Sequence, residues 1–236
     1  MLCSCVSRET QERPILEIEM SAKTTTILAG IIILLSLIAG VLLYDKLPDP
    51  MASHWGVNDQ VDDYMSKFWG VFLMPLVSLA MLLIFLIIPR LDPLKENIAE
   101  FRETFNLFIL LMILFMTYLW ILTIFWNLGY TFFKMSTALL PAMGLLFVFI
   151  GYMLGKAKRN WFIGIRTPWT LSSDTVWDET HRLGSILFVA SGILTMIGVF
   201  FGSYAVWFIL VPTLGTSLFL VVYSYILYQR ETKSAE

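Results

Sequence analysis

The sequence has too little charge to cover a soluble core. Only 14% of its 236 residues are Asp, Glu, Lys or Arg, whereas 58% belong to the hydrophobic set. An ordinary soluble domain has about 25% charged residues, and disordered proteins combine high charge with low hydrophobicity. A soluble globule of this length could not bury so many apolar side chains. The composition therefore indicates an integral membrane protein.

Cysteine, excess positive charge and catalytic motifs are also missing. Cys3 and Cys5 are too few for a disulfide framework or a structural zinc site, and we assign them no role. The 16 Lys and Arg nearly balance the 18 Asp and Glu, so no direct nucleic-acid binding is expected. No nucleophile elbow, zinc-protease motif or phosphate-binding glycine loop occurs. We predict neither an enzyme nor a cofactor or metal site.

Stretches without charge organise the chain. They cover 24–44, 68–89, 104–133, 135–155 and 183–229. About 20 apolar residues cross a bilayer as a helix, so each of the first four predicts one span. The last is long enough for two spans, 183–201 and 205–228, separated by Gly202-Ser203-Tyr204. The sequence thus predicts an all-α integral membrane protein with six transmembrane helices in the cell (plasma) membrane.

The positive charges predict the orientation. Only Lys46, Lys67 and Lys134 fall on one side of the predicted spans, while the other 13 Lys and Arg fall on the opposite side. The positive-inside rule then places both termini in the cytoplasm. We divide the chain into a cytoplasmic segment (1–23), spans one and two with the outer acidic loop 45–67 (24–89), spans three and four (90–155), and the inner loop 156–182 with spans five and six (156–236).

Local signals mark helix starts near the predicted inner side. Asp92-Pro93 predicts that the third membrane helix begins at Pro93, and Ser172-Ser173-Asp174 offers caps for a helix leading into span five. The first span has no cleavage site after it and is expected to be an uncleaved anchor. Met20, just before this span, is a second candidate for the start of translation.

Two loops resemble a known family. The outer loop contains Leu47-Pro48-Asp49-Pro50-Met51-Ala52-Ser53-His54-Trp55 and Val61-Asp62-Asp63-Tyr64-Met65-Ser66-Lys67. The inner loop contains Asn160-Trp161-Phe162-Ile163-Gly164-Ile165-Arg166-Thr167-Pro168-Trp169-Thr170-Leu171 and Val176-Trp177-Asp178-Glu179-Thr180-His181-Arg182-Leu183-Gly184. The inner motif is similar to the signature of the SdpI-type membrane immunity proteins. The outer motif resembles the short extracytoplasmic domain that often precedes that signature.

The outer motif departs from the family pattern at three positions. Gly56 stands where Asn is usual, and Asp59 and Asp63 stand where Gly is usual. Because Asn and Asp tolerate left-handed backbone geometry, Asn58-Asp59 is still expected to turn.

The resemblance implies six spans and protection against a secreted peptide toxin. We therefore predict a membrane sensor or immunity protein that responds to such a toxin or to another membrane-active factor. Its expected partners are the lipid bilayer, a peptide toxin outside and, as in one family member, a cytoplasmic repressor inside. The alternative is a small transporter or exporter, which predicts polar residues that converge between helices around a continuous cavity, such as Asn106, Thr117, Thr123 and Asn127.

The matching positions supply candidate residues in the outer loop. The ligand-binding candidates are His54, Trp55, Asp62, Tyr64 and Lys67. The alternative is that they only fold the loop, through packing of Trp55 on Tyr64 and contact of Asp62 with Lys67.

The inner loop supplies candidates for partner binding or loop organisation. They are Asn160, Gly164, Arg166, Thr167, Pro168, Trp169, Trp177, His181 and Arg182. Because a guanidinium stays charged and offers five donors, we expect Arg166 either to tie the loop to the helix near Asp174 or to dock a cytoplasmic partner. If Arg166 ties the loop to this helix, we also expect Trp169 and Trp177 to lie at the lipid headgroups. His181 is expected at the membrane interface, or as a base near Asp178 and Glu179.

Overall fold

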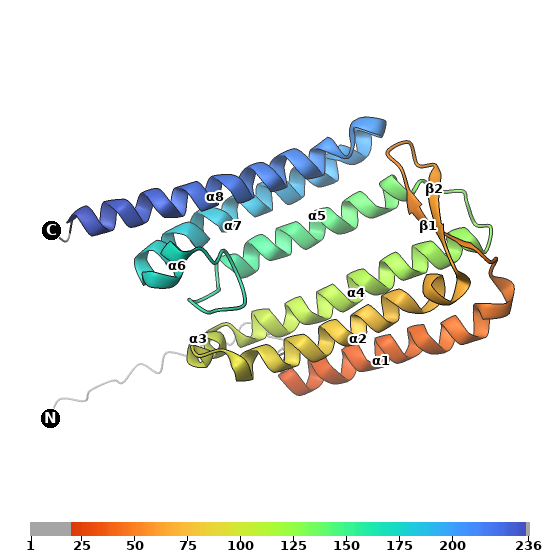
Figure 1. Ribbon diagram of the computed structural model, residues 1–236, viewed down its shortest axis with the longest axis horizontal. Helices are drawn as coiled ribbons and strands as arrows, with labels where there is room; N and C mark the ends of the chain where they lie inside the picture. Colours follow the sequence, from red (N-terminus) through yellow and green to blue (C-terminus); the bar gives the residue numbers. More distant parts are fainter. Residues whose placement is uncertain (1–19, 235–236) are drawn as a thin grey trace, which may run out of the picture.

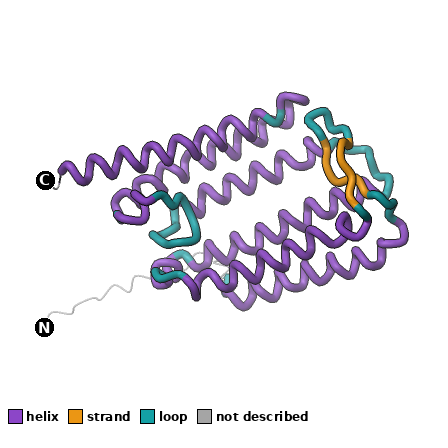
Figure 2. Tube along the Cα trace, in the orientation of Figure 1, coloured by secondary structure: helices purple, strands orange, loops and turns teal. Residues whose placement is uncertain are grey.

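Six long helices make up most of the computed structural model, which describes residues 20–234 (Figures 1 and 2). Each is long and apolar enough to span a bilayer, which confirms the predicted six-span, all-α protein of the cell membrane. Cys3 and Cys5 lie outside the described residues. The long helices are α1 (Ala22–Leu43), α2 (Lys67–Leu91), α4 (Arg102–Asn127), α5 (Met135–Leu154), α7 (Asp174–Ile197) and α8 (Trp207–Ser234).

The shorter elements lie at the two ends of these helices. One end carries a two-stranded hairpin, which the sequence did not predict, and two 3-10 helices: β1 (Met51–Trp55), β2 (Val61–Met65), η1 (Tyr44–Lys46) and η2 (Gly198–Tyr204). The other end carries α3 (Lys95–Glu100) and α6 (Pro168–Ser172) together with the start of α1 and the end of α8 (Figure 1). We call these the outer and inner ends, following the predicted orientation.

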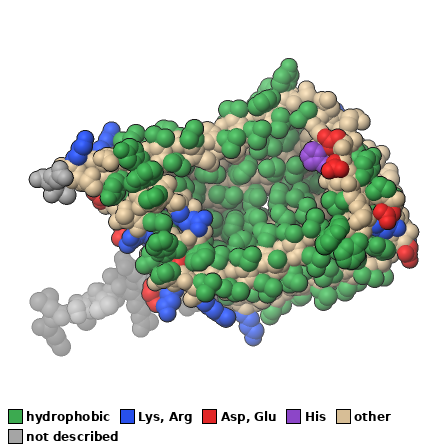
Figure 3. Space-filling model, viewed as in Figure 1, with side chains coloured by type: hydrophobic (Ala, Val, Ile, Leu, Met, Phe, Trp, Pro, Cys, Tyr) green, Lys and Arg blue, Asp and Glu red, His purple; other side chains and the backbone are tan. Residues whose placement is uncertain are grey.

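The six helices pack as two groups of three. Helices α1, α2 and α4 all contact one another. In the second group, α7 contacts both α5 and α8, and α4 contacts α5 where the two groups meet (Figure 1). Ile33, Leu82 and Ile109 belong to the buried core of the first group, and this core continues at the inner end to Trp177 of α7. Exposed apolar side chains cover much of the lateral surface, as a lipid-facing protein requires (Figure 3).

Prolines inside two helices create hydrogen-bond acceptors that neighbouring helices use. Pro75 of α2 has no N–H, so the carbonyl four residues earlier, that of Val71, lacks its helical partner. The indole Nε1–H of Trp120 in α4 donates to this carbonyl at 2.7 Å. In α8, Pro212 likewise frees the carbonyl of Phe208, which accepts from the Thr195 hydroxyl of α7 at 3.2 Å. Each proline therefore fixes a helix–helix contact rather than weakening the bundle.

Helices α5 and α7 approach closely because glycines face each other. A Cβ built on Gly144 would lie 2.6 Å from the carbonyl oxygen of Gly192, and one on Gly151 would lie 2.7 Å from that of Ser185. Small residues allow such backbone approach between membrane helices, where packing replaces the hydrophobic effect as the driving force. Any larger side chain at these positions would force α5 and α7 apart.

The helix boundaries correct one expectation and confirm two. The third membrane helix does not run continuously from Pro93, because α3 ends at Glu100 and the backbone at Phe101 (φ −119°, ψ 26°) separates it from α4. The side chain of Ser173 caps α7 by accepting from the N–H of Val176, as expected. The long apolar stretch is interrupted in η2, where Gly202 has φ +55°.

Candidate functional site

The outer hairpin is a short antiparallel pair with a tight tip. Met51 lies opposite Met65, and Trp55 lies opposite Val61. At the tip, Asp59 has φ +57°, which confirms the expected left-handed turn. The N–H of Gly56 donates to the carbonyl of Gln60 at 2.8 Å, which closes the tip. The hairpin is therefore a defined structure and presents its side chains at fixed positions.

Polar and apolar contacts attach the hairpin to the first helix group. Met51 is fully buried against Gly70 of α2. The side-chain amide of Asn127, at the end of α4, pairs with the backbone of Ala52: its Oδ1 accepts from the Ala52 N–H at 2.8 Å, and its Nδ2 donates to the Ala52 carbonyl at 3.0 Å. Asn127 thus continues the hydrogen bonding of β1 onto a membrane helix.

Two acids of the outer loop satisfy the N-termini of two helices. The carboxylate of Asp49 accepts from the N–H of Lys67, the first residue of α2, at 3.1 Å. The carboxylate of Asp59 accepts from both the N–H and the hydroxyl of Ser136, in the first turn of α5, each at 2.7 Å. Negative charge at these positions is favourable because helix N-termini carry unpaired N–H groups and a positive partial charge. Asp59 therefore links the hairpin to the second helix group.

The candidate ligand-binding residues of the outer loop do not contact one another in the way expected if they only folded the loop. His54 Nδ1 lies 2.5 Å from Asp62 Oδ1, and both side chains are more than half exposed. The ammonium of Lys67 lies 5.2 Å from the ring centre of Tyr44 rather than beside Asp62. The expected contact between Asp62 and Lys67 is therefore wrong.

The aromatic residues of the hairpin also separate. The ring of Trp55 packs edge-on against Trp126 of α4, with ring centres 5.6 Å apart. Tyr64 is 56% exposed, and its backbone pairs with Ala52. The expected packing of Trp55 on Tyr64 is thus replaced by a contact between the hairpin and a membrane helix.

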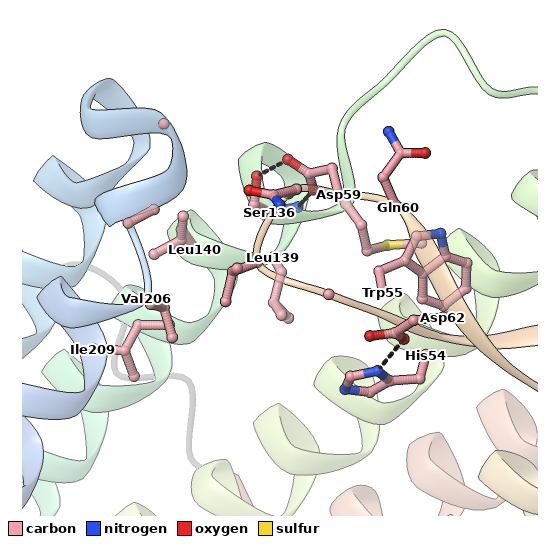
Figure 4. A pocket seen from close by; sticks show the side chains of 16 residues that line it. His54, Trp55, Asp59, Gln60, Asp62, Ser136, Leu139, Leu140, Val206 and Ile209 are labelled. Carbon is pink, nitrogen blue, oxygen red and sulfur yellow. Dashed lines mark hydrogen bonds and ion pairs between the residues drawn. The ribbon is translucent and has the colours of Figure 1, made fainter.

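A cavity of about 700 Å³ lies beneath the hairpin (Figure 4). Leu139 and Leu140 of α5 and Val206 and Ile209 near the start of α8 give it an apolar wall, while the pair of His54 and Asp62 lies on the hairpin side. In Figure 3, a hollow lined with hydrophobic side chains opens beside the histidine and its acidic neighbours. Among residues 20–234, no group of three or more His, Cys, Asp or Glu could hold a metal ion. The cavity suits an amphiphilic ligand.

The inner loop begins with a turn built around a buried asparagine. Asn160 is fully buried, and its Oδ1 accepts from the N–H groups of Phe162 and Ile163 at 2.9 and 2.6 Å. Its Nδ2 donates to the carbonyls of Lys158 and Ile163 at 2.8 and 3.0 Å. A single side chain thereby satisfies four backbone groups of a segment that has no regular secondary structure.

Trp177, His181 and Gly164 form the centre of the inner loop. The rings of Trp177 and His181 stack with centres 3.9 Å apart, and the Nε1–H of Trp177 donates to the carbonyl of Ala157. His181 Nδ1 donates to the carbonyl of Trp177 at 2.8 Å, and its Nε2 accepts from the N–H of Ile165 at 3.0 Å. This pattern requires the neutral imidazole with its hydrogen on Nδ1, because the protonated ring has no acceptor.

These contacts correct two expectations. Trp177 is fully buried rather than at the headgroups, and His181 is 2% exposed rather than interfacial. Both ring nitrogens of His181 bond to the backbone, so neither is free to serve as the expected base near Asp178 and Glu179. Gly164 has φ +109°, and a Cβ there would collide with His181 Nε2. Only glycine fits at this point of the loop.

A second buried polar group joins the loop to α8. Thr167 caps α6 together with Thr170, and Pro168 is the first residue of that helix, where a missing N–H costs nothing. The Thr167 hydroxyl also lies 3.1 Å from the hydroxyl of Ser224 in α8. Nearby, the Ser173 hydroxyl donates to Glu231 at 2.9 Å. The loop is therefore fastened to the last helix at two points.

The arginine that ties the loop to α7 is Arg159, not Arg166. The guanidinium of Arg159 pairs with the carboxylate of Asp174 at 2.7 Å and donates to the carbonyl of Leu171 at 2.8 Å. Arg166 is exposed and donates to the carbonyl of Trp161 at 2.8 Å, within its own turn. Arg182 pairs with Glu179 on the surface of α7. The predicted link between Arg166 and the helix near Asp174 is therefore wrong.

Trp169 is half-buried against Tyr225 of α8.

The segment after α2, which belongs to the first helix group, forms hydrogen bonds to the inner loop. Asp92 is 3% exposed, and its carboxylate accepts from the N–H of Leu94 at 2.7 Å and from that of Trp161 at 2.9 Å. The side-chain amide of Asn97 donates to the carbonyl of Arg159 at 2.7 Å. Neither residue could be recognised from the sequence as a partner of the loop, because contacts between residues more than sixty positions apart leave no local signal.

The polar residues named for a transporter bond to separate partners. Asn106 donates to the carbonyl of Met20, Thr123 to that of Leu119 in its own helix, and Asn127 to the hairpin. Thr117 borders a space too small to admit water. These side chains therefore do not surround a continuous cavity within the described part of the chain.

Comparison with known proteins covers nearly the whole chain. Residues 156–226 match the SdpI/YfhL protein family, and residues 31–79 match a domain of unknown function, DUF1648. The sequence is 30% identical over 207 residues to "Immunity protein SdpI" of Bacillus subtilis (strain 168), which covers 86% of this chain and 96% of that protein. No solved structure matches.

Proposed function

The chain belongs to the SdpI/YfhL protein family, and we propose that it is a membrane immunity protein whose outer cavity receives part of a secreted peptide toxin or another membrane-active factor. The observation that carries this proposal is the cavity of about 700 Å³ beneath the hairpin. Ligand sites commonly have volumes of about 300–1,000 Å³ and combine apolar walls with a few polar groups.

The position of the cavity suits a ligand that partitions into the membrane. Its apolar wall comes from the outer ends of α5 and α8, and its polar groups, His54 and Asp62, come from the hairpin. Asp49 and Asp59 are engaged with helix N-termini, and Asp62 with its partner His54 is the exposed pair that borders the cavity. Apolar side chains of a peptide would enter the cavity while its polar backbone stays at the hairpin.

Response to the ligand is proposed to reach a cytoplasmic repressor through α5 and α7. The hairpin holds the first turn of α5 through Asp59 and Ser136, α5 packs on α7 through Gly144 and Gly192, and α7 carries Trp177 of the inner loop. A ligand that displaced the hairpin tip would act on the N-terminus of α5. The exposed edge of the inner loop, which includes Trp161 and Arg166, is the surface proposed for docking of the repressor.

A cavity-filling variant tests the ligand site. Leu139→Trp would occupy the cavity, whereas Leu214→Trp places the same side chain on α8 at a position that is 64% exposed. Cells that lack their own immunity protein would express each variant and be challenged with a secreted peptide toxin against which the parent protein protects them. We expect Leu139→Trp to lose protection at normal membrane abundance and Leu214→Trp to keep it. Full protection by Leu139→Trp would exclude the cavity as the site.

His54→Ala tests the polar side of the same site. The imidazole contacts only Asp62 among the hydrogen-bonding groups described and is largely exposed, so its removal should leave folding intact. We expect weaker protection from this variant, because the ligand would meet an unpaired carboxylate in place of the imidazole–carboxylate pair. Unchanged protection would indicate that His54 serves the hairpin alone.

A further inference from the structure

A second cavity, of about 390 Å³, lies at the inner ends of α5 and α7. It is formed between the segment that follows α5 and residues 178–186 of α7. It lies away from the hairpin and is no part of the proposed toxin site. Its wall comprises Leu154, Gly155, Lys156, Ala157, Lys158, Asp178, His181, Arg182, Ser185 and Ile186.

Positive charge dominates the polar side of this cavity. Lys156, Lys158 and Arg182 border it, against one carboxylate, that of Asp178. The guanidinium of Arg182 also forms an ion pair with the carboxylate of Glu179 on the surface. Within residues 20–234, neither lysine side chain makes an ion pair or a hydrogen bond, so both ammonium groups are available to a ligand. An anion placed between them would gain charge-assisted hydrogen bonds from two directions.

The opposite side of the cavity is apolar and lies deeper along the helices. Leu154 ends α5, and Ile186 of α7, which is 59% exposed, points to the lipid-facing surface. Between the two sides lies Ser185, whose hydroxyl can donate a hydrogen bond. His181 forms part of the wall but offers no donor, because both ring nitrogens already bond to the backbone. The order from cations through a hydroxyl to apolar side chains matches an amphiphile with an anionic head.

We infer that this cavity binds the headgroup phosphate of an anionic phospholipid of the inner leaflet. Lys156 and Lys158 hold the phosphate, Arg182 adds a third cation, and the start of an acyl chain lies along Ile186. Basic pockets between membrane helices on the cytoplasmic side are suited to anionic headgroups, and each cation near the membrane surface strengthens binding about fivefold. Asp178 faces the same space and can accept from a headgroup hydroxyl, which favours phosphatidylglycerol.

Native mass spectrometry of the full-length protein in detergent, titrated with dioleoyl phosphatidylglycerol or dioleoyl phosphatidylcholine, tests this inference. The variant Lys156→Gln/Lys158→Gln/Arg182→Gln removes the three cations of the cavity. The matched control Lys23→Gln/Arg230→Gln/Lys233→Gln removes three exposed cations from the inner ends of α1 and α8. We expect the cavity variant to bind phosphatidylglycerol about a hundredfold more weakly, from the combined effect of three cations, and the control to bind as the parent does.

Equal losses in the two variants, or equal affinity of the parent for both lipids, would overturn the inference, because binding would then follow overall charge or apolarity alone. Displacement of phosphatidylglycerol by millimolar inorganic phosphate would also overturn it, by assigning the site to a free anion. The double variant Lys156→Gln/Lys158→Gln keeps the pair of Arg182 and Glu179 and serves if the triple variant does not fold. None of these readings depends on protection against a toxin, so the proposed function can fail independently.

Discussion

The outer hairpin and the inner loop both fasten the two helix groups together, but they use polar side chains in different ways. In the inner loop, Asn160, Thr170 and His181 are buried, and their hydrogen-bonding groups are met by the protein itself. In the hairpin, His54 and Asp62 are exposed and border a cavity. Buried polar groups are costly unless satisfied, so the residues of the inner loop are required for folding, whereas the exposed pair is available for recognition.

This contrast changes how the inner signature is understood. A motif rich in Trp, Arg and His looks like a binding surface in the sequence. In the structure, Trp177 and His181 instead form a small core in a segment with little regular secondary structure. Trp161 and Arg166, by contrast, are exposed and can be reached by a partner. The comparison can be tested by substitutions whose effects on stability should differ between the two ends.

The largest effect is expected from Gly164→Ala. The backbone at this position has φ +109°, and the added Cβ would collide with His181, so the free energy of unfolding should fall by about 3 kcal/mol. Thermal unfolding of the purified protein in detergent measures the loss. Gly215→Ala is the control, because this helical glycine of α8 has open space around it and alanine is the better helix former. Equal stability of both variants would contradict a core-like inner loop.

A smaller loss is expected from Asp59→Gly at the tip of the hairpin. Glycine accepts the left-handed backbone without strain, so the change isolates the loss of the cap on α5, which should cost about 1 kcal/mol. Asn58→Gly, one position earlier, removes an exposed side chain that caps no helix and should leave the melting temperature nearly unchanged. If the two variants melted together, the hairpin would not hold the second helix group through Asp59.

The smallest effect is expected from Arg166→Lys, and Arg159→Lys is its matched partner. Lys keeps the charge but loses the planar fork, so Arg159→Lys should lower the free energy of unfolding by about 1 kcal/mol through its contacts with Asp174 and Leu171. Arg166→Lys loses one exposed hydrogen bond and should cost less than about 0.5 kcal/mol. The same melting experiment ranks the two, and the reverse order would restore Arg166 as the residue that organises the loop.

Much of the fold could be predicted because a bilayer imposes simple rules. Charge-free stretches of sufficient length located all six spans, and the interruption at Gly202 separated the last two. Local chemistry also identified Ser173 as a helix cap and Asn58-Asp59 as a turn. These features depend on neighbouring residues, so a sequence shows them directly.

The partners of the candidate residues could not be predicted in the same way. The sequence contains several arginines near Asp174, and only the path of the loop decides that Arg159 reaches it. Asp59 meets Ser136, and Asp92 meets Trp161, across long separations without a periodic pattern. The hairpin itself was missed because its strands are five residues each and lie in a loop that contains many charged residues.

The bonds from α8 to the inner loop also set an order for biogenesis. A chain emerges from the ribosome N-terminus first, so the hairpin and its Asp59 precede α5 and can receive that helix as it crosses the membrane. Thr167 and Ser173, by contrast, can form their hydrogen bonds to Ser224 and Glu231 only after the final helix has been synthesised. The outer end can therefore assemble during synthesis, whereas the inner end is completed only when the last span has been inserted.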